Sequence, residues 1–114
     1  MTRGHFRAWV SATLKIDTMS LVFEWDSRKA RSNDRKHGIS FDEAISVFSN
    51  SLARIFPDDE HSKEEVREII IGHSATKRLL LVCFTEPAPD RVRIISARRA
   101  TKAEQHDYEE HIAS

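Results

Sequence analysis

The feature that most constrains the fold is a series of apolar, β-rich runs in the second half of the chain. Such runs occupy residues 66–72, 78–85 and 91–97, and turn-sized segments separate them. A shorter run, residues 52–56, precedes them and ends at a proline. Apolar runs joined by short turns are typical of successive antiparallel strands. The second half of the chain is therefore predicted to form a largely antiparallel sheet.

The segment before this sheet is predicted to contain a strand and a helix, because its hydrophobic pattern differs from that of the later apolar runs. Residues 21–25 alternate in the manner of a short strand. Asp26 can cap a helix over residues 27–37, and Gly38 can take the left-handed conformation that ends it. The sequence thus predicts a strand followed directly by a helix.

Two capping boxes mark further helices. Ser40 with Glu43 opens a segment whose apolar residues, Phe41, Ala44, Ile45 and Phe48, follow helical spacing. Thr101 with Glu104 opens a closing helix that ends near residue 112. The predicted order is β-α-α-β-β-β-β-α. This order indicates one small α+β domain, with a largely antiparallel sheet of four to five strands flanked by helices.

The first 18 residues are harder to assign. Phe6, Trp9, Val10 and Leu14 follow roughly helical spacing, and Arg7 with Ser11 breaks any continuous apolar stretch of a secretory signal. We expect residues 1–18 to be an N-terminal extension, disordered or upstream of the true start, and residues 19–114 to be the domain. The alternative is a short helix that docks on the domain or on a partner.

Composition excludes several classes of function. The formal net charge is zero, from 18 Lys and Arg against 18 Asp and Glu. A single cysteine, Cys83, allows no internal disulfide and fits the reducing cytoplasm. No apolar run approaches the ~18 residues of a membrane span. No metal site or other cofactor is expected, because the histidines lack ligand spacing and Cys83 lies mid-strand as a small packed residue.

The charges are nevertheless segregated. Residues 91–102 hold five cations and no acid, whereas residues 58–65 form an acidic loop that we expect to be solvated. Strict alternation would place Arg91 and Arg93 on the strand face opposite Ser96 and Arg98. The basic strand fits two readings equally: a phosphate-binding surface for RNA, or a solvated edge strand whose arginines pair with glutamates of the last helix.

The helix over residues 27–37 has a polar inner face. Asn33 and His37, four residues apart, lie on the side nearest the core. They either hydrogen-bond carbonyls and lock the helix to the sheet, or provide a histidine for proton transfer.

The chain closely resembles the BrnT toxin family. The resemblance rests on residues 23–26 (FEWD), Asn33, residues 36–44 (KHGISFDEA), Ile71-Gly72 with Arg78, and residues 93–100 (RIISARRA). It covers about residues 20 to 110 in the expected order. It implies a RelE-like fold and a metal-independent endoribonuclease that inhibits translation by cleaving RNA. It also implies a BrnA-like antitoxin partner with a ribbon-helix-helix part, through which alone the toxin would reach operator DNA.

Such ribonucleases use the RNA's own 2′-hydroxyl to attack the adjacent phosphate, which requires a base, cations and an acid. The candidate catalytic residues are Lys36, His37, Arg67, Arg93, Ser96 and Arg98, and the candidate RNA-binding residues are Arg78, Arg91 and Arg99. In this assignment the arginines hold phosphate, Lys36 or His37 moves the proton, and Ser96 orients an arginine. The main alternative is a non-catalytic module that binds nucleic acid or protein.

Overall fold

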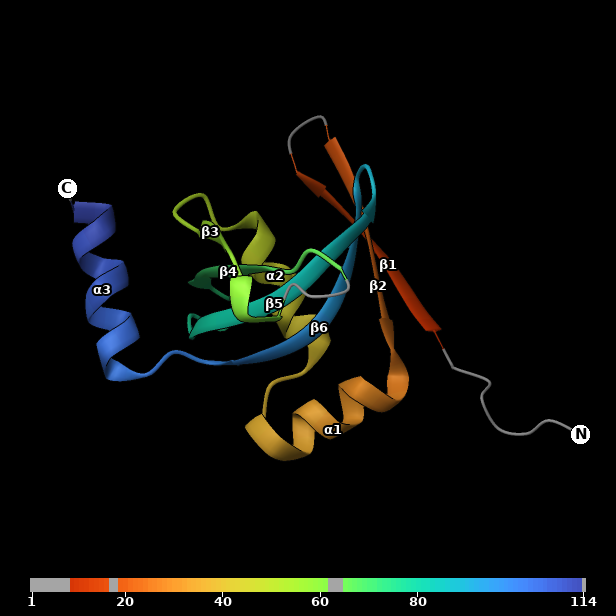
Figure 1. The fold of residues 1–114 in the computed structure, drawn as a ribbon, viewed down its shortest axis with the longest axis horizontal. Helices are drawn as coiled ribbons and strands as arrows, with labels where there is room; N and C mark the ends of the chain where they lie inside the picture. The colour runs from red at the N-terminus through yellow and green to blue at the C-terminus, as the bar shows by residue number, and fades with distance from the viewer. Residues whose placement is uncertain (1–8, 17–18, 62–64, 114) are drawn as a thin grey trace, which may run out of the picture.

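The computed structural model describes residues 9–16, 19–61 and 65–113. Within them the chain forms three α-helices and one six-stranded mixed sheet with the order β1-β2-β6-β5-β4-β3 (Figure 1). The elements, in chain order, are β1 Trp9–Ile16, β2 Met19–Asp26, α1 Ser27–His37, α2 Phe41–Ser46, β3 Arg54–Pro57, β4 Glu68–His73, β5 Leu79–Ala88, β6 Arg91–Arg99 and α3 Lys102–Ala113. Among the described helices, none is long and apolar enough to cross a membrane.

The α+β class is confirmed, but the strand count and the strand directions differ from the prediction. The sheet has six strands rather than four to five, and β2 pairs with β6 in parallel rather than antiparallel. The parallel contact is short, from Val22 opposite Arg91 to Glu24 opposite Arg93. It arises because α1, α2 and three further strands lie between β2 and β6 in the chain, so β6 returns beside β2 in the same direction.

Strand β1 replaces the helix considered for the N-terminal segment. Trp9–Ile16 pairs antiparallel with the whole of β2, and Ala12 and Leu14 pack against the core. The helical spacing was therefore misleading, because a pairing partner decides between strand and helix for a short apolar segment. Residues 1–8 lie outside the described residues. That the domain starts at Met19 stays a prediction.

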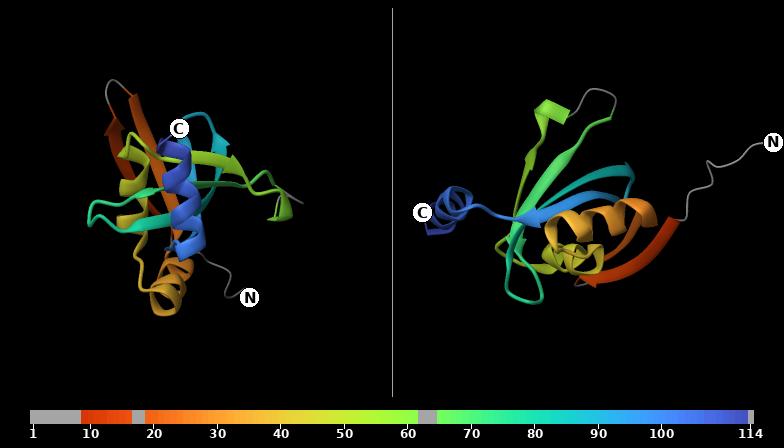
Figure 2. Two further views of the ribbon diagram at one scale, coloured as in Figure 1. Left: turned by 90° about the vertical axis from the view of Figure 1, so that its left-hand side faces the viewer. Right: turned by 90° about the horizontal axis from the view of Figure 1, so that it is seen from below.

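The main core lies between one face of the sheet and the helices α1 and α2, which lie side by side (Figure 2). Alternate residues of β5, among them Leu80, Val82 and Phe84, point into it and are almost fully buried. Phe48 packs against two of the core aromatic rings. Its ring centroid lies 4.9 Å from that of Phe23 and 5.1 Å from that of Phe84.

Asn33 fixes α1 to the edge of β6. Strand β2 leaves β6 after Glu24, so the backbone of Ala97 has no β2 neighbour. The Asn33 side chain takes that place: its amide nitrogen donates to the Ala97 and Ile39 carbonyls at 2.8 and 3.0 Å, and its oxygen accepts from the Ala97 N–H at 3.0 Å. The structural interpretation of Asn33 is thus confirmed.

The opposite face of the sheet, which we call the open face, carries a smaller cluster. Ile71, Leu81 and Tyr108 are buried there, and the Tyr108 hydroxyl donates to the Leu52 carbonyl at 2.9 Å. Tyr108 belongs to α3, which stands apart from α1 and α2 at the left-hand end of the view (Figure 1). The open face is therefore only partly covered, and this leaves room for a site.

Candidate active site

Strand β6 contains a bulge. Phe84 of β5 lies opposite Ile94, whereas the preceding Cys83 lies opposite Ser96, so Ile95 is an extra residue. An extra residue in one strand shifts the side chains that follow it to the other face.

The bulge places Arg93, Ser96 and Arg98 on the open face together, since Ile94 and Ala97 both belong to the main core. The strict alternation that separated Arg93 from Ser96 and Arg98 was therefore wrong. Sequence periodicity could not reveal the bulge, because it depends on the register with β5.

Three of the candidate catalytic residues, Arg67, Ser96 and Arg98, line one hollow on the open face. It has a volume of about 340 Å³. Its described lining consists of Asp58, Glu60, His61, Arg67, Ile69, Leu81, Cys83, Ile95, Ser96 and Arg98. Two arginines, a histidine and a hydroxyl therefore converge on a space large enough for a small ligand group.

The cations of this hollow are compensated by carboxylates. Arg98 makes two hydrogen bonds of 2.8 Å to the two oxygens of Glu104. The Arg98 bonds are the largest cause that lowers the pKa of Glu104 to about 2. Arg67 lies 3.9 Å from Glu65. A phosphate that enters would therefore exchange with these carboxylates.

Arg91 and Arg93 form a second group at the β2 edge of the same face. Both bond Glu24, at 3.0 and 2.8 Å. Burial alone would raise the pKa of Glu24, but the bonds and charges of Arg93 and Arg91 lower it below its ordinary 4.5. The Trp9 ring lies 5.0 Å from the Arg93 guanidinium, a cation–π contact made by β1.

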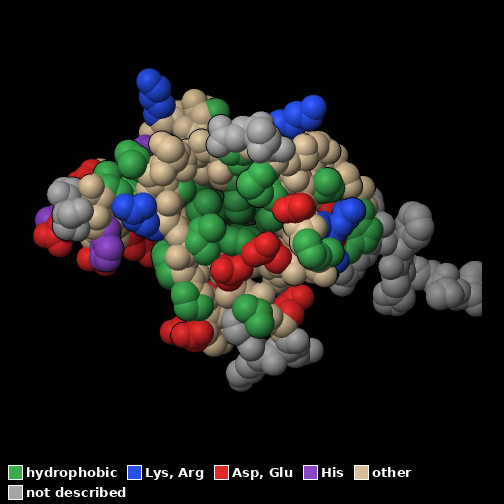
Figure 3. All heavy atoms as spheres, turned by 90° about the horizontal axis from the view of Figure 1, so that it is seen from above, with side chains coloured by type: hydrophobic (Ala, Val, Ile, Leu, Met, Phe, Trp, Pro, Cys, Tyr) green, Lys and Arg blue, Asp and Glu red, His purple; other side chains and the backbone are tan. Residues whose placement is uncertain are grey.

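The space-filling view shows how side chains of each type are distributed on one side of the molecule (Figure 3). From above, apolar side chains occupy the hollowed middle of the surface, acidic side chains border it, and the basic side chains are few and separated (Figure 3). Among the described residues seen from this side, the basic side chains therefore form no continuous patch.

Comparison with known proteins assigns the chain to a family. The model of the family described as "Ribonuclease toxin, BrnT, of type II toxin-antitoxin system" matches residues 25–104. The chain belongs to the BrnT family. The crystal structure of the Brucella abortus ribonuclease toxin BrnT is similar, with a TM-score of 0.54 and 28% identity over 68% of this chain and 94% of that one. No curated protein matches the sequence.

Arg78 of this BrnT chain lies outside the hollow. Its guanidinium bonds both oxygens of Glu43 and also reaches the Gly38 carbonyl at 3.4 Å. Ser74 and Thr76 donate to the same Glu43 carboxylate at 2.7 and 2.6 Å. Arg78 thus ties the β4–β5 turn to α2. Ser40 caps α2, as predicted, because its hydroxyl oxygen accepts from the Glu43 N–H at 3.0 Å, but the Glu43 side chain bonds Arg78.

Lys36, His37 and Arg99 are not brought to the hollow either. Lys36 and His37 form the last residues of α1, where Lys36 is exposed and His37 half-buried. Arg99 is exposed at the end of β6. The structure therefore leaves the hollow without the two proton-transfer candidates chosen from the sequence.

The hollow contains a different histidine, which sequence reasoning missed. His61 and Asp58 belong to the segment expected to be a solvated acidic loop. Asp59–His61 is exposed, as expected, but the structure forms it into a 3₁₀ turn, and Asp58 and His61 both line the hollow. The three-residue spacing of aspartate and histidine was the available signal.

Cys83 also lines the hollow rather than the main core. Burial, followed by the charge of Asp58, raises the pKa of its thiol to about 11. A thiol held protonated is a poor nucleophile, so Cys83 packs and donates a weak hydrogen bond instead.

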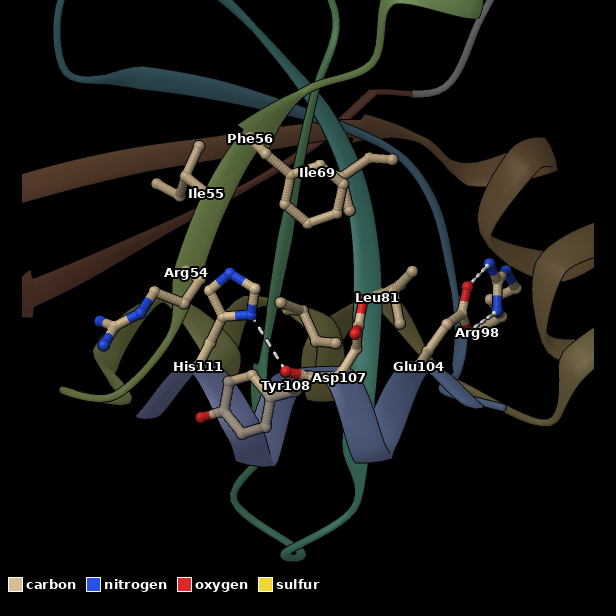
Figure 4. Close-up of a pocket in the computed structure, with 11 residues that line it drawn as sticks. Arg54, Ile55, Phe56, Ile69, Leu81, Arg98, Glu104, Asp107, Tyr108 and His111 are labelled. Atoms are coloured by element: carbon tan, nitrogen blue, oxygen red, sulfur yellow. Dashed lines mark hydrogen bonds and ion pairs between the residues drawn. The ribbon is translucent and has the colours of Figure 1, made fainter. Parts of the chain in front are cut away.

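A larger groove adjoins the hollow and shares Ile69, Leu81 and Arg98 with it (Figure 4). Its volume is about 520 Å³. Ile55 and Phe56 of β3 face Tyr108 and other residues of α3 across it. Arg98 with Glu104 lies at the boundary between the polar hollow and this apolar groove. Among the described residues no group of three histidine, cysteine or acidic side chains could hold a metal ion.

Proposed function

We propose that this BrnT chain is a metal-independent endoribonuclease whose active surface is the hollow on the open face. The observation that supports this location is the convergence of Arg67, Ser96 and Arg98. Arg67 comes from the segment before β4, and Ser96 and Arg98 come from β6. The family description supplies the ribonuclease class.

In the proposed reaction the RNA 2′-oxygen attacks the adjacent phosphorus after losing its proton to a base. The bond from phosphorus to the 5′-oxygen breaks, and that oxygen takes a proton from water. The products are a 2′,3′-cyclic phosphate and a free 5′-hydroxyl. Arg67 and Arg98 would stabilise the charge that develops on the phosphate oxygens. Arg93 would hold a neighbouring phosphate, in a RelE-like arrangement that spreads catalysis over several basic residues.

The ion pairs fit such a role. Arginine binds phosphate in the same bidentate geometry with which Arg98 now binds Glu104. The guanidinium is therefore already oriented before RNA arrives, which reduces the entropy lost on binding. Exchange of a carboxylate for a phosphate changes the partner and not the geometry.

The test is cleavage of RNA by the purified protein in the presence of EDTA. We expect cutting to persist and to leave 5′-hydroxyl ends, which accept phosphate from a polynucleotide kinase without prior dephosphorylation. Ends that already carry a 5′-phosphate would refute the mechanism. RNA binding with no products at all would favour the non-catalytic module instead.

We also propose that the antitoxin of this toxin is a BrnA-like ribbon-helix-helix protein. In this proposal the toxin reaches operator DNA only through the antitoxin. The pair acts in the cytoplasm, where translated RNA is found. Co-expression of the two proteins should relieve growth arrest and give a complex that purifies intact. A toxin that binds operator DNA alone would contradict this arrangement.

A further inference from the structure

His61 and Asp58 form a hydrogen-bonded pair at the hollow. The Nδ1 atom of His61 lies 3.1 Å from both carboxylate oxygens of Asp58. The backbone adds a second link, because the His61 N–H donates to the Asp58 carbonyl at 3.2 Å. The pair is therefore held by a turn as well as by its side chains.

Asp58 is the fixed member of this pair. Its backbone N–H donates to the Arg67 carbonyl at 2.9 Å, which ties the pair to one of the phosphate-binding candidates. The Cys83 thiol approaches the Asp58 Oδ2 at 3.7 Å, a distance suited to a sulfur donor. The Asp58 side chain is 12% exposed and the His61 side chain 62% exposed, so the carboxylate is anchored while the ring meets solvent.

The carboxylate determines which ring nitrogen is available. A carboxylate only accepts hydrogen bonds, so Nδ1 must carry the proton of the neutral ring. The Nε2 atom then has a lone pair and can act as a base. An aspartate that orients a histidine in this tautomer is a recurrent device of proton-transfer sites.

We infer that His61, oriented by Asp58, is the base that takes the 2′-hydroxyl proton in the hollow, with Arg67 and Arg98 on the phosphate. This inference rests on the proposed function. The 2′-oxygen keeps the electron pair of its O–H bond and attacks phosphorus, and the proton goes to His61 Nε2. Water protonates the leaving 5′-oxygen, and the imidazolium returns its proton to solvent. His61 is the catalytic residue in this step, and Asp58 is a positioning residue.

The experiment measures kcat and KM of the full-length protein on a short RNA. We expect His61→Ala to lower kcat by about 100-fold or more, the usual contribution of a general base, with KM little changed. Added imidazole should restore part of the lost rate, because it replaces the missing group. Asp58→Asn should lower kcat by about tenfold or more through misorientation of the ring, again with little change in KM.

His106→Ala is the matched control. His106 is also an exposed histidine that pairs with a carboxylate, Glu110 at 3.4 Å, but it lies on α3 and does not line the hollow. We expect its activity and melting temperature to equal those of the unsubstituted protein. His61→Ala should melt at the same temperature as well, since its side chain is mostly exposed.

The outcomes separate the two proposals. Cleavage by the unsubstituted protein, its loss in His61→Ala and its rescue by imidazole support both. Unimpaired cleavage by His61→Ala overturns the role of His61 as the base but does not contradict the ribonuclease function. Loss of activity that imidazole does not rescue also overturns the base role. If the unsubstituted protein does not cleave RNA, the proposed function fails and the role of His61 fails with it.

Discussion

Replacement of Glu43 by glutamine should destabilise the fold without touching the candidate active site. The Glu43 carboxylate accepts hydrogen bonds from Ser74, Thr76 and Arg78, and its side chain is 10% exposed. The bond from Arg78 is the largest cause that lowers the pKa of Glu43 to about 2. Burial acts in the opposite direction, and Thr76 and Ser74 lower the pKa further. Glutamine would remove the charge and turn an amide N–H₂ toward these donors.

The magnitude follows from this pKa. A fall from 4.5 to about 2 corresponds to about 3 kcal/mol of stabilisation of the charged form in the folded state. Arg78 is 32% exposed, so solvent screens part of the pair, and we expect a loss of about 1–2 kcal/mol. In a domain of this size that loss lowers the melting temperature by about 5–10 °C. Because the pKa of Glu43 is lower in the folded than in the unfolded state, the stabilisation is complete above about pH 4.5. It disappears as the pH falls toward about 2.

Urea unfolding followed by tryptophan fluorescence, to which buried Trp25 contributes, would measure the effect. The matched control is Asp42→Asn, which removes a negative charge from the same first turn of α2 but from an exposed position. The control should lose only the interaction with the helix dipole, about 0.3–1 kcal/mol. The reasoning is refuted if Glu43→Gln and Asp42→Asn are equally stable near neutral pH. It is refuted as well if acid does not remove the difference between Glu43→Gln and the unsubstituted protein.

Three further predictions concern Asn33, strand β1 and Arg93. Asn33→Ala should cost about 2–3 kcal/mol in urea unfolding, because it leaves both backbone groups of Ala97 without their partner; a change below about 0.5 kcal/mol would mean that water replaces the amide. A chain that begins at Met19 should melt several degrees lower than the full-length protein, because it lacks the strand Trp9–Ile16; an unchanged melting temperature would show that the strand is dispensable. Arg93→Ala should reduce RNA cleavage at least about tenfold, roughly 1.4 kcal/mol of transition-state stabilisation, with an unchanged circular dichroism spectrum. Full activity would move the site away from this end of β6.

The elements set by local chemistry could be predicted from the sequence. Helix α1 spans Ser27–His37 as expected, because Asp26 accepts from the Arg28 N–H at 2.8 Å and Gly38 has a φ of 69°. Both caps are determined by residues within one turn of the helix. Strand β1 could not be predicted in the same way. Its conformation depends on the antiparallel pairing with β2, and its helical spacing gave the opposite answer.

The site was only half predictable for a related reason. Arg67 and Arg98 could be selected because a guanidinium suits phosphate, and Ser96 because a hydroxyl can orient an arginine. Their convergence depends on the bulge at Ile95, which arises from a register shift against β5. His61 was missed because an acidic segment exposed to solvent gives no sign of its neighbours in the fold, whereas a backbone bond from Asp58 to the Arg67 carbonyl holds Asp58 beside the hollow.

The compensated arginines also bear on how a chain of zero net charge would bind RNA in the proposed function. Each arginine of the open face that the proposal uses already has a carboxylate nearby: Glu24 for Arg93, Glu65 for Arg67 and Glu104 for Arg98. Long-range attraction between this surface and RNA is therefore weak, and binding must come from short-range exchange of carboxylate for phosphate. Glu104 also accepts from the Thr101 N–H at the start of α3, so phosphate capture by Arg98 would disturb the cap of that helix. The proposed active surface and the attachment of α3 thus share one ion pair, so a partner that binds α3 would change how readily Arg98 exchanges Glu104 for phosphate.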